Sequence, residues 1–439
     1  MMFRAFAWIA LLLLAAPAIA QPAPAAAPQA AEPLKARIAQ LPAILAGAAD
    51  YDAYFSAEFR AQVPKAQVMA INAQLAAAGG PVTGVEAVTP LSLWTANFTL
   101  GFRDGVGAVW IAVDPAAPNR VTGLRFLGFT AREATLDAVA ASLRALPGQT
   151  GFAYARLGDG APRLLMSDHE DRPFAIGSAF KLVILAELVR ATNAGERKWT
   201  DTVTLDGITA LPGGAYTLSP AGTQVTLRDL AAKMISVSDN SATDILLATL
   251  GRTRVEAMLP VLGIANPAAL RPFIGTLDMF KLKGIRGGEL AAQWLALDEA
   301  GRRAMLDGQL AREPVLAILP TLFSDGKPIL IDKVEWFETP ADLVRVMDWL
   351  RRNTAGGPGA EARAILSINP GIARPAAGRW AWVGYKGGSE PGVINMTLLL
   401  QGKDQAWYVI TASWNNTEAA IDEARFAGLV SKAAELAAP

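Results

Sequence analysis

Hydrophobic and polar positions follow two different periods along the first part of the chain. Ile38, Leu41 and Leu45 recur with the spacing of an amphipathic helix, as do apolar residues between 68 and 75. Residues 82–88, 93–102, 106–113 and 121–127 then read as strands, and Asp104-Gly105 between the second and third indicates a hairpin. The pattern predicts a small α+β domain over residues 34–130, with helices followed by an antiparallel sheet.

The pattern changes again near residue 134. Residues 136–143 have helical spacing, and residues 151–157 and 163–166 read as strands. The chain closes with two strand-like runs, 393–400 and 407–413, and a helix from 417 to about 436, while most of the sequence between is helical. We therefore expect a second α+β domain, residues 134–437, in which helices flank an antiparallel sheet.

The first 33 residues differ from both domains. Arg4 precedes an apolar run from 5 to 20 that ends on Ala18-Ile19-Ala20, and an Ala/Pro/Gln-rich stretch follows. This order predicts a cleavable signal peptide at 1–20, a linker at 21–33, and a periplasmic or secreted protein with no stable membrane span after cleavage. The alternative is an uncleaved anchor, but the run is shorter than the roughly 20 residues that a spanning helix prefers.

Composition narrows the possible chemistry. Lys plus Arg and Asp plus Glu both number 40, so the chain lacks the basic excess with which proteins neutralise phosphate, and we expect no nucleic-acid partner. The chain has no cysteine, which excludes thiol catalysis and disulfides, and one histidine, His169, in a polar turn-like segment. A single histidine argues against a Ser-His-Asp triad and against a histidine-rich metal site. We expect neither a metal nor a cofactor.

A serine–lysine pair is the first candidate for chemistry. Ser178 and Lys181 form a Ser-x-x-Lys motif between an apolar run and the helical stretch 182–190. Ser178 is thus expected at a helix N-terminus, where free N–H groups favour negative charge, and Lys181 on the same face can reach its hydroxyl. A buried lysine loses its proton readily and can act as a base. Alone the motif is a weak indication of catalysis, because a helix-capping serine followed by a surface lysine has the same pattern. The chain also contains a second copy of the motif at Ser324 and Lys327.

A second motif, Ser238-Asp239-Asn240, lies 60 residues after Ser178 and follows an amphipathic helical stretch. The Ser238 hydroxyl could pass a proton, and the Asn240 amide could hold a substrate carbonyl. Taken alone, the tripeptide is also a common turn or helix cap.

A third motif, Lys386-Gly387-Gly388-Ser389, follows a predicted edge strand at 382–385. Glycines beside a strand allow a substrate to approach the backbone closely. The Ser389 N–H could pair with that of Ser178 as an oxyanion hole, and Lys386 could attract a substrate carboxylate. The alternative is a turn at the end of a strand with a solvated lysine.

In this order the three motifs resemble those of class A β-lactamases and penicillin-binding proteins, over roughly residues 135–437. The resemblance implies a serine acyl-transfer enzyme with Ser178 as nucleophile, Lys181 as base and Ser238 as proton relay. It also implies a substrate-binding role for Asn240 and for residues 386–389. A small domain resembling a steroid isomerase (NTF2-like) ahead of such a domain is similar to the family of a clavulanic-acid biosynthesis protein.

Two features depart from class A. Those enzymes carry a glutamate on an omega loop that activates the water for deacylation, but residues 271–281, where the loop is expected, contain only Asp278 as a carboxylate. Surplus sequence follows between 281 and 335, with helical spacing at 290–297 and 302–310, and Glu335 or Glu338 could approach the site. Gly387 also replaces the usual Thr or Ser, which removes a hydroxyl that binds the β-lactam carboxylate.

We therefore expect an exported serine hydrolase that acts on a small ester or β-lactam-like molecule and hydrolyses β-lactams slowly, if at all. One alternative is a D-Ala-D-Ala peptidase with peptidoglycan as its partner. Another is a penicillin-binding sensor that is acylated and stops.

Overall fold

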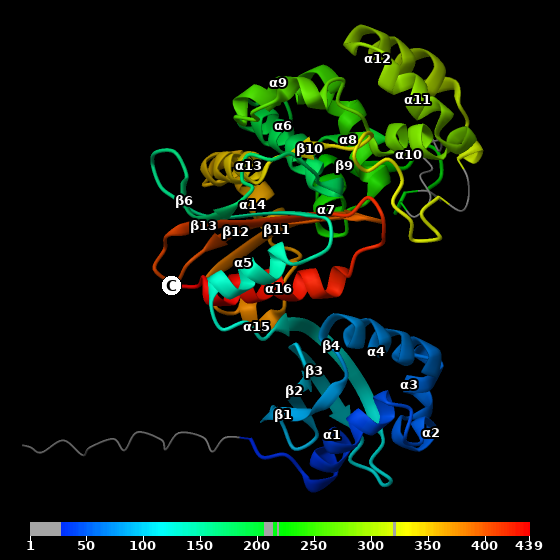
Figure 1. Cartoon of the computed structure of the whole chain (residues 1–439), viewed down its shortest axis with the longest axis vertical. Helices are drawn as coiled ribbons and strands as arrows, with labels where there is room; N and C mark the ends of the chain where they lie inside the picture. Colours follow the sequence, from blue (N-terminus) through cyan, green and yellow to red (C-terminus); the bar gives the residue numbers. More distant parts are fainter. Residues whose placement is uncertain (1–27, 206–213, 217–218, 319–321) are drawn as a thin grey trace, which may run out of the picture.

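The computed structural model describes residues 28–205, 214–216, 219–318 and 322–439, and it contains helices and antiparallel sheets, as the hydrophobic pattern predicts. The predicted signal peptide, 1–20, and most of the predicted linker lie outside these residues. Within them the chain forms two units that meet at the C-terminal helix (Figure 1).

The first unit is a four-stranded antiparallel sheet in the order β1-β2-β3-β4, packed against helices. Its elements are α1(Glu32–Leu45), α2(Tyr51–Tyr54), α3(Ala57–Gln62), α4(Lys65–Gly79), β1(Val82–Pro90), β2(Thr95–Phe102), β3(Gly105–Val113) and β4(Val121–Ala131). Leu34, Ile38 and Leu41 line the buried face of α1, which confirms the helical spacing seen in the sequence. The helix begins inside the predicted linker, because Pro33 occupies its first turn, where a missing N–H has no cost.

The second unit is built on a five-stranded antiparallel sheet in the order β11-β12-β13-β5-β6. The strands are β5(Gln149–Leu157), β6(Arg163–Asp168), β11(Trp382–Glu390), β12(Val393–Gln401) and β13(Trp407–Asn415). The strand of the third motif is an edge strand, as predicted, and it continues through the motif to Glu390. The last helix begins at Glu423, later than expected, because Asp422 caps it by accepting a hydrogen bond from the Arg425 N–H over 2.9 Å.

Two helical layers cover this sheet. The helices α5(Leu136–Arg144), α15(Arg374–Ala377) and α16(Glu423–Leu436) lie on one face, and most of the helices between β7 and β11 lie on the other (Figure 1). The latter region contains β7(Phe174–Ala175), η1(Gly177–Phe180), α6(Lys181–Asn193), β8(Thr202–Thr204), β9(Gln224–Thr226), α7(Leu227–Ser236), α8(Asn240–Leu250), α9(Arg252–Val261), η2(Pro267–Leu270), α10(Thr276–Gly284), η3(Ile285–Gly288), α11(Glu289–Ala296), α12(Glu299–Met305), η4(Leu306–Leu310), η5(Val315–Ala317), β10(Phe337–Glu338), α13(Pro340–Asn353), η6(Gly357–Gly359) and α14(Ala360–Leu366). The predicted helices at 290–297 and 302–310 correspond to α11 and to α12 with η4. No helix in the described part of the chain is long and apolar enough to cross a membrane.

The helix that follows Ser178 is the centre of this layer. Nearly every residue of α6 from Lys181 to Thr192 is buried, including polar Glu187. A helix that is apolar on all sides belongs in a core, so α6 is held by neighbours around its whole circumference. The first turn of α6, which carries Lys181, is therefore a rigid base for the site.

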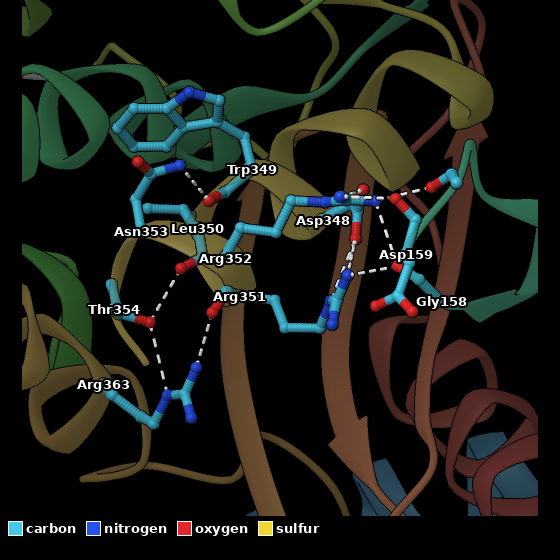
Figure 2. A network of polar contacts seen from close by, with 11 residues as sticks. Gly158, Asp159, Asp348, Trp349, Leu350, Arg351, Arg352, Asn353, Thr354 and Arg363 are labelled. Carbon is cyan, nitrogen blue, oxygen red and sulfur yellow. Dashed lines mark hydrogen bonds and ion pairs between the residues drawn. The ribbon is translucent and has the colours of Figure 1, made fainter. Parts of the chain in front are cut away.

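Hydrogen bonds connect α13 to the turn between β5 and β6. Arg351 donates to the carbonyl of Gly158 over 2.6 Å, and Arg352 donates to that of Asp159 over 2.8 Å, both in the turn between β5 and β6 (Figure 2). Asp348, one turn earlier, accepts from both arginines at 2.9 Å. The hydrogen bonds join a helix and a hairpin that lie far apart in the sequence.

The two units meet along α16 and β4. A Cβ on Gly428 of α16 would lie 2.7 Å from the ring of Phe129, so helix and strand are in close contact. The other side of α16 buries Phe426, Leu429 and Val430 in the core of the second unit. This helix therefore connects the first unit to the sheet that carries the third motif.

Candidate active site

Ser178 lies in a single 3-10 turn, η1, directly before α6. The chain reaches this turn through β7, and Ile176 donates its N–H to the Trp336 carbonyl over 3.1 Å. The ring of Phe180 stacks on Trp336 with centroids 3.7 Å apart and planes 7° from parallel. Packing on both sides of Ser178 thus holds the serine at the N-terminal end of a buried helix, where the sequence predicts it.

Lys181 is fully buried beside the second motif. Its Nζ donates to the carbonyl and to the hydroxyl of Ser238, over 2.7 and 3.2 Å, and to Asn240 Oδ1 over 2.7 Å. Burial lowers the pKa of Lys181 to about 7, against the opposing charges of Asp244 and Asp239. Among the described residues no hydrogen bond joins Lys181 to the Ser178 hydroxyl, and such bonds in unliganded sites commonly form only when substrate binds.

Ser238 connects two buried lysines. Its hydroxyl accepts from Lys181 at 3.2 Å and from Lys386 at 3.0 Å. Burial, with the nearby Lys181, holds the pKa of Lys386 well below its ordinary value. Ser238 has a positive φ of 58°, a strained backbone for a residue other than glycine, and such strain concentrates at functional sites. The hydroxyl between two amines is suited to moving a proton.

The third motif passes against the backbone of the nucleophile. A Cβ on Gly388 would lie less than 3.0 Å from the amide nitrogen of Ser178 and from the Ile176 carbonyl. Gly177 has a positive φ of 48°, and a Cβ there would lie 3.1 Å from the Ser389 nitrogen. Only glycines allow this approach, which brings the N–H groups of Ser178 and Ser389 together, as an oxyanion hole requires.

A cavity of about 490 Å³ opens over these motifs, lined among others by Ser178, Ser238, Tyr385 and Glu423. A Cβ on Gly387 would lie less than 3.0 Å from the hydroxyl of Tyr385, so the tyrosine fills the place of the missing Thr or Ser side chain. Burial raises the pKa of Tyr385 to about 12. Partial burial also raises the pKa of Glu423, while a hydrogen bond with the Ser389 side chain lowers it. Neither residue was predicted at the site, although Tyr385 precedes Gly387 by two residues and thus faces the same side of the strand.

Lys386, by contrast, points its amine inward. The side chain is buried and donates to the Ser238 hydroxyl and to the carbonyl of Gly387. This geometry favours a role in proton transfer over the attraction of a substrate carboxylate.

A second cavity of about 270 Å³ lies on another side of the nucleophile, lined by Ser178, Asn240, Glu335 and Glu390 among others. The region expected to form the omega loop is here α10 and the turn before it. Its one carboxylate, Asp278, caps α10 through the Gly275 N–H at 2.8 Å and pairs with Arg252 at 3.1 Å, so its role is structural.

Of the two candidate glutamates, Glu335 lines this second cavity, and Glu338 lines neither cavity at the motifs. The carboxyl oxygens of Glu338 are buried with no hydrogen-bond partner among the described residues, and burial raises its pKa to about 8. Lys283 and Glu390, which no sequence motif indicated, join Glu335 in a buried ion cluster.

The remaining candidates lie elsewhere. His169 is half exposed, and its Nδ1 lies 3.0 Å from the Thr150 carbonyl, in keeping with the surface position expected. The side chain of Lys327 in the repeated Ser-x-x-Lys is 79% exposed, whereas that of Lys181 is buried. A larger cavity of about 970 Å³, lined by Asp171, Asp332 and others, contains no residue of the three motifs.

Comparison with known proteins agrees with the class of this site. Residues 132–306, under half of the chain, match a family model described as "Beta-lactamase enzyme family". The match supports a β-lactamase- or penicillin-binding-like serine hydrolase as the class of the second unit. No curated protein matches the chain.

Solved structures similar to the chain include a β-lactamase from Sphaerobacter thermophilus, with 22% identity, a TM-score of 0.47, and 69% of this chain and 95% of that chain covered. An ancestral class A β-lactamase of Gram-negative bacteria has 19% identity and a TM-score of 0.47, over 69% and 98% of the two chains. A structure described as PBP-A has 15% identity and a TM-score of 0.46, over 69% and 93%.

Proposed function

We propose that the protein is a serine hydrolase that forms an acyl-enzyme on Ser178 with Lys181 as the base, and that its substrates are small esters, including acyl groups on β-lactam-like molecules. The observation that carries the proposal is the buried amine of Lys181, whose pKa of about 7 lets it take a proton near neutral pH. Its position one turn after Ser178 and beside Ser238 supports the assignment.

The proposed acylation uses these three side chains and two backbone N–H groups. Ser178 Oγ gives its proton to the Lys181 amine and attacks the ester carbonyl carbon. The N–H groups of Ser178 and Ser389 stabilise the oxyanion. When the intermediate collapses, the bond to the alcohol oxygen breaks, and that oxygen takes a proton from the Lys181 ammonium through the Ser238 hydroxyl. An acyl-enzyme and a free alcohol result.

The charges around the larger motif cavity support a neutral ester over a penicillin. Gly387 offers no hydroxyl, the amine of Lys386 is turned inward, and Glu423 adds a carboxylate at the rim. The carboxylate of a β-lactam would therefore meet the like charge of Glu423.

Steady-state kinetics test this proposal. Wild type is expected to hydrolyse a short-chain p-nitrophenyl ester, and Ser178→Ala is expected to lose this activity. Full esterase activity in Ser178→Ala, or penicillin hydrolysis faster than ester hydrolysis, would contradict it. Turnover of a D-Ala-D-Ala peptide with no ester hydrolysis would point to the peptidase alternative, and stable acylation without release to the sensor.

We also propose export to the periplasm or beyond, and a steroid-isomerase-like first domain as in the clavulanic-acid biosynthesis family. Export is supported by the apolar run that ends on Ala18-Ile19-Ala20. The domain assignment is supported by helices α1 to α4 packed on the sheet β1 to β4. Cell fractionation and N-terminal sequencing of the mature protein test export: a chain that retains residues 1–20 would contradict it.

A further inference from the structure

A buried ion cluster lies beside the nucleophile and has no part in the acylation proposed above. Lys283 of α10 donates to Glu335 over 3.0 Å and to Glu390 over 2.5 Å. The side chains of Lys283 and Glu335 are 0% exposed, and that of Glu390 is 7% exposed. Two carboxylates share one ammonium, so one negative charge is uncompensated when all three groups are ionised, and the cluster has a high affinity for a proton.

The two carboxylates differ in how far they are satisfied. Glu335 accepts from Lys283 with one oxygen and from the Trp336 N–H, at 3.2 Å, with the other. Glu390 accepts from Lys283 with Oε1, and its Oε2 is buried with no hydrogen-bond partner among the described residues. A buried acceptor without a partner is unfavourable, and a water molecule that donates to it removes the penalty.

The unpaired oxygen, Glu390 Oε2, belongs to a residue that lines a cavity at the nucleophile. Glu390 and Ser178 line the same cavity of about 270 Å³, which has room for several waters at roughly 30 Å³ each. Glu390 also follows Ser389 directly on β11. The Ser389 nitrogen lies close to Gly177, since a Cβ on that glycine would lie 3.1 Å from it. An acyl group on Ser178, with its carbonyl oxygen between the N–H groups of Ser178 and Ser389, would thus be reached by water from the side of Glu390.

We propose that Glu390 is the general base that activates water to remove the acyl group from Ser178. The inference rests on the proposed function, because it assumes an acyl-enzyme at Ser178. It gives this chain a deacylating carboxylate on strand β11 in place of one on the segment 271–281, where only Asp278 is found, in a structural role.

In deacylation, water takes the place that the alcohol has in acylation. Glu390 Oε2 takes a proton from water as the water oxygen forms a bond to the ester carbonyl carbon, and the N–H groups of Ser178 and Ser389 stabilise the oxyanion. The bond between that carbon and Ser178 Oγ then breaks, and Oγ takes the proton that Glu390 received from the water. The carboxylic acid product leaves, with the Ser178 hydroxyl, the neutral Lys181 amine and the Glu390 carboxylate restored. Lys283 and Glu335 act as positioning residues.

The electrostatics suit this role. Burial, together with the charge of Glu335, raises the pKa of Glu390 well above its ordinary value, and Lys283 opposes the shift. Once ionised, a carboxylate with a raised pKa is a stronger base than a solvated one. The pKa of Lys283 is raised by both glutamates against burial, so the lysine stays charged.

The test compares Glu390→Gln with wild type on p-nitrophenyl acetate, by stopped-flow absorbance and intact mass spectrometry. The expected result is an unchanged burst of p-nitrophenol, a steady-state rate lower by about 100-fold or more, and accumulation of acetyl-enzyme. Hydroxylamine, which attacks esters without a general base, is expected to restore turnover in the variant. Glu187→Gln is the matched control, because the Glu187 side chain is also buried (1% exposed, against 7% for Glu390), pairs with Arg190 at 2.6 Å and lines neither motif cavity.

Glu390→Asp provides a second variant that keeps the charge for Lys283 and shortens the reach of the base. It is expected to acylate normally and to release acetate slowly. Equal burst and steady-state rates in Glu390→Gln and wild type would overturn the assignment of the base alone. An equal fall of acylation and deacylation in both Glu390 variants would also overturn it, by showing a structural role. A wild type that forms no acetyl-enzyme would overturn the nucleophile itself, and the base with it.

Discussion

The Lys181 amine donates to Asn240 Oδ1 over 2.7 Å, so the first and second motifs share a buried hydrogen bond. An amide at this position accepts the bond without adding a negative charge beside the amine. Burial is therefore the largest influence on Lys181, and its pKa falls to about 7. An uncharged partner is what allows the lysine to act as a base.

The first prediction concerns the pH dependence of acylation. The neutral amine is the active form, so kcat/KM for ester hydrolysis is expected to rise about tenfold per pH unit below 7 and to level off above it. Asn240→Asp places a carboxylate beside the amine and is expected to move this inflection upward by about 1 to 3 units. The same inflection in both proteins would show that Lys181 is not the titrating base.

The second prediction concerns the close approach at Gly388. Gly388→Ala places a Cβ against backbone atoms of Ser178 and Ile176, so β11 has to move away and separate the two oxyanion N–H groups. We expect kcat to fall about 100- to 1000-fold, the range for loss of one oxyanion donor. Gly356→Ala is the control, because its Cβ would meet nothing within 4 Å and should leave kcat unchanged. Equal kinetics of the two variants would contradict the oxyanion assignment.

The third prediction concerns the charge at the rim of the motif cavity. Glu423→Lys replaces a carboxylate by a cation and is expected to raise kcat/KM for an ester that carries a carboxylate, relative to a neutral ester of equal size. Salt should weaken the effect, since the site is open to solvent. Glu435→Lys, at the far end of the same helix and outside the cavity, should not change the ratio. A ratio that stays constant in Glu423→Lys would remove this residue from substrate selection.

The fourth prediction concerns stability. Burial raises the pKa of Glu338 from 4.5 to about 8, so the folded protein holds a proton that the unfolded chain releases as pH rises above 4.5. The free energy of unfolding should therefore fall between about pH 4.5 and pH 8. At about 1.4 kcal/mol per pKa unit, Glu338→Gln should stabilise the protein by a few kcal/mol at pH 8 and hardly at all at pH 4. Urea unfolding at both pH values measures this, and an equal effect at both would contradict it.

Local pattern was enough to predict much of the fold. Apolar residues at helical spacing, such as Ile38 and Leu41, predicted α1, and Asp104-Gly105 correctly marked the turn between β2 and β3. The structure also brings Lys181, Ser238 and Lys386 together, although they are far apart in the sequence. Their order and spacing had indicated this grouping.

Contacts that depend on tertiary packing could not be predicted from the sequence. Lys283, Glu335 and Glu390 form one cluster only because α10, the segment before β10 and the end of β11 converge. No spacing rule connects residues on such unrelated elements. The end of the linker was misplaced for a local reason, since Pro33 is compatible both with a linker and with the first turn of a helix.

The most direct test of the central claim is intact mass spectrometry of wild type and Ser178→Ala after mixing with p-nitrophenyl acetate, followed by peptide mapping. The account predicts one acetyl group per wild-type chain, located on Ser178, and none on the variant. Acetylation of Ser178→Ala to the same extent, or a wild-type label on another residue, would contradict it.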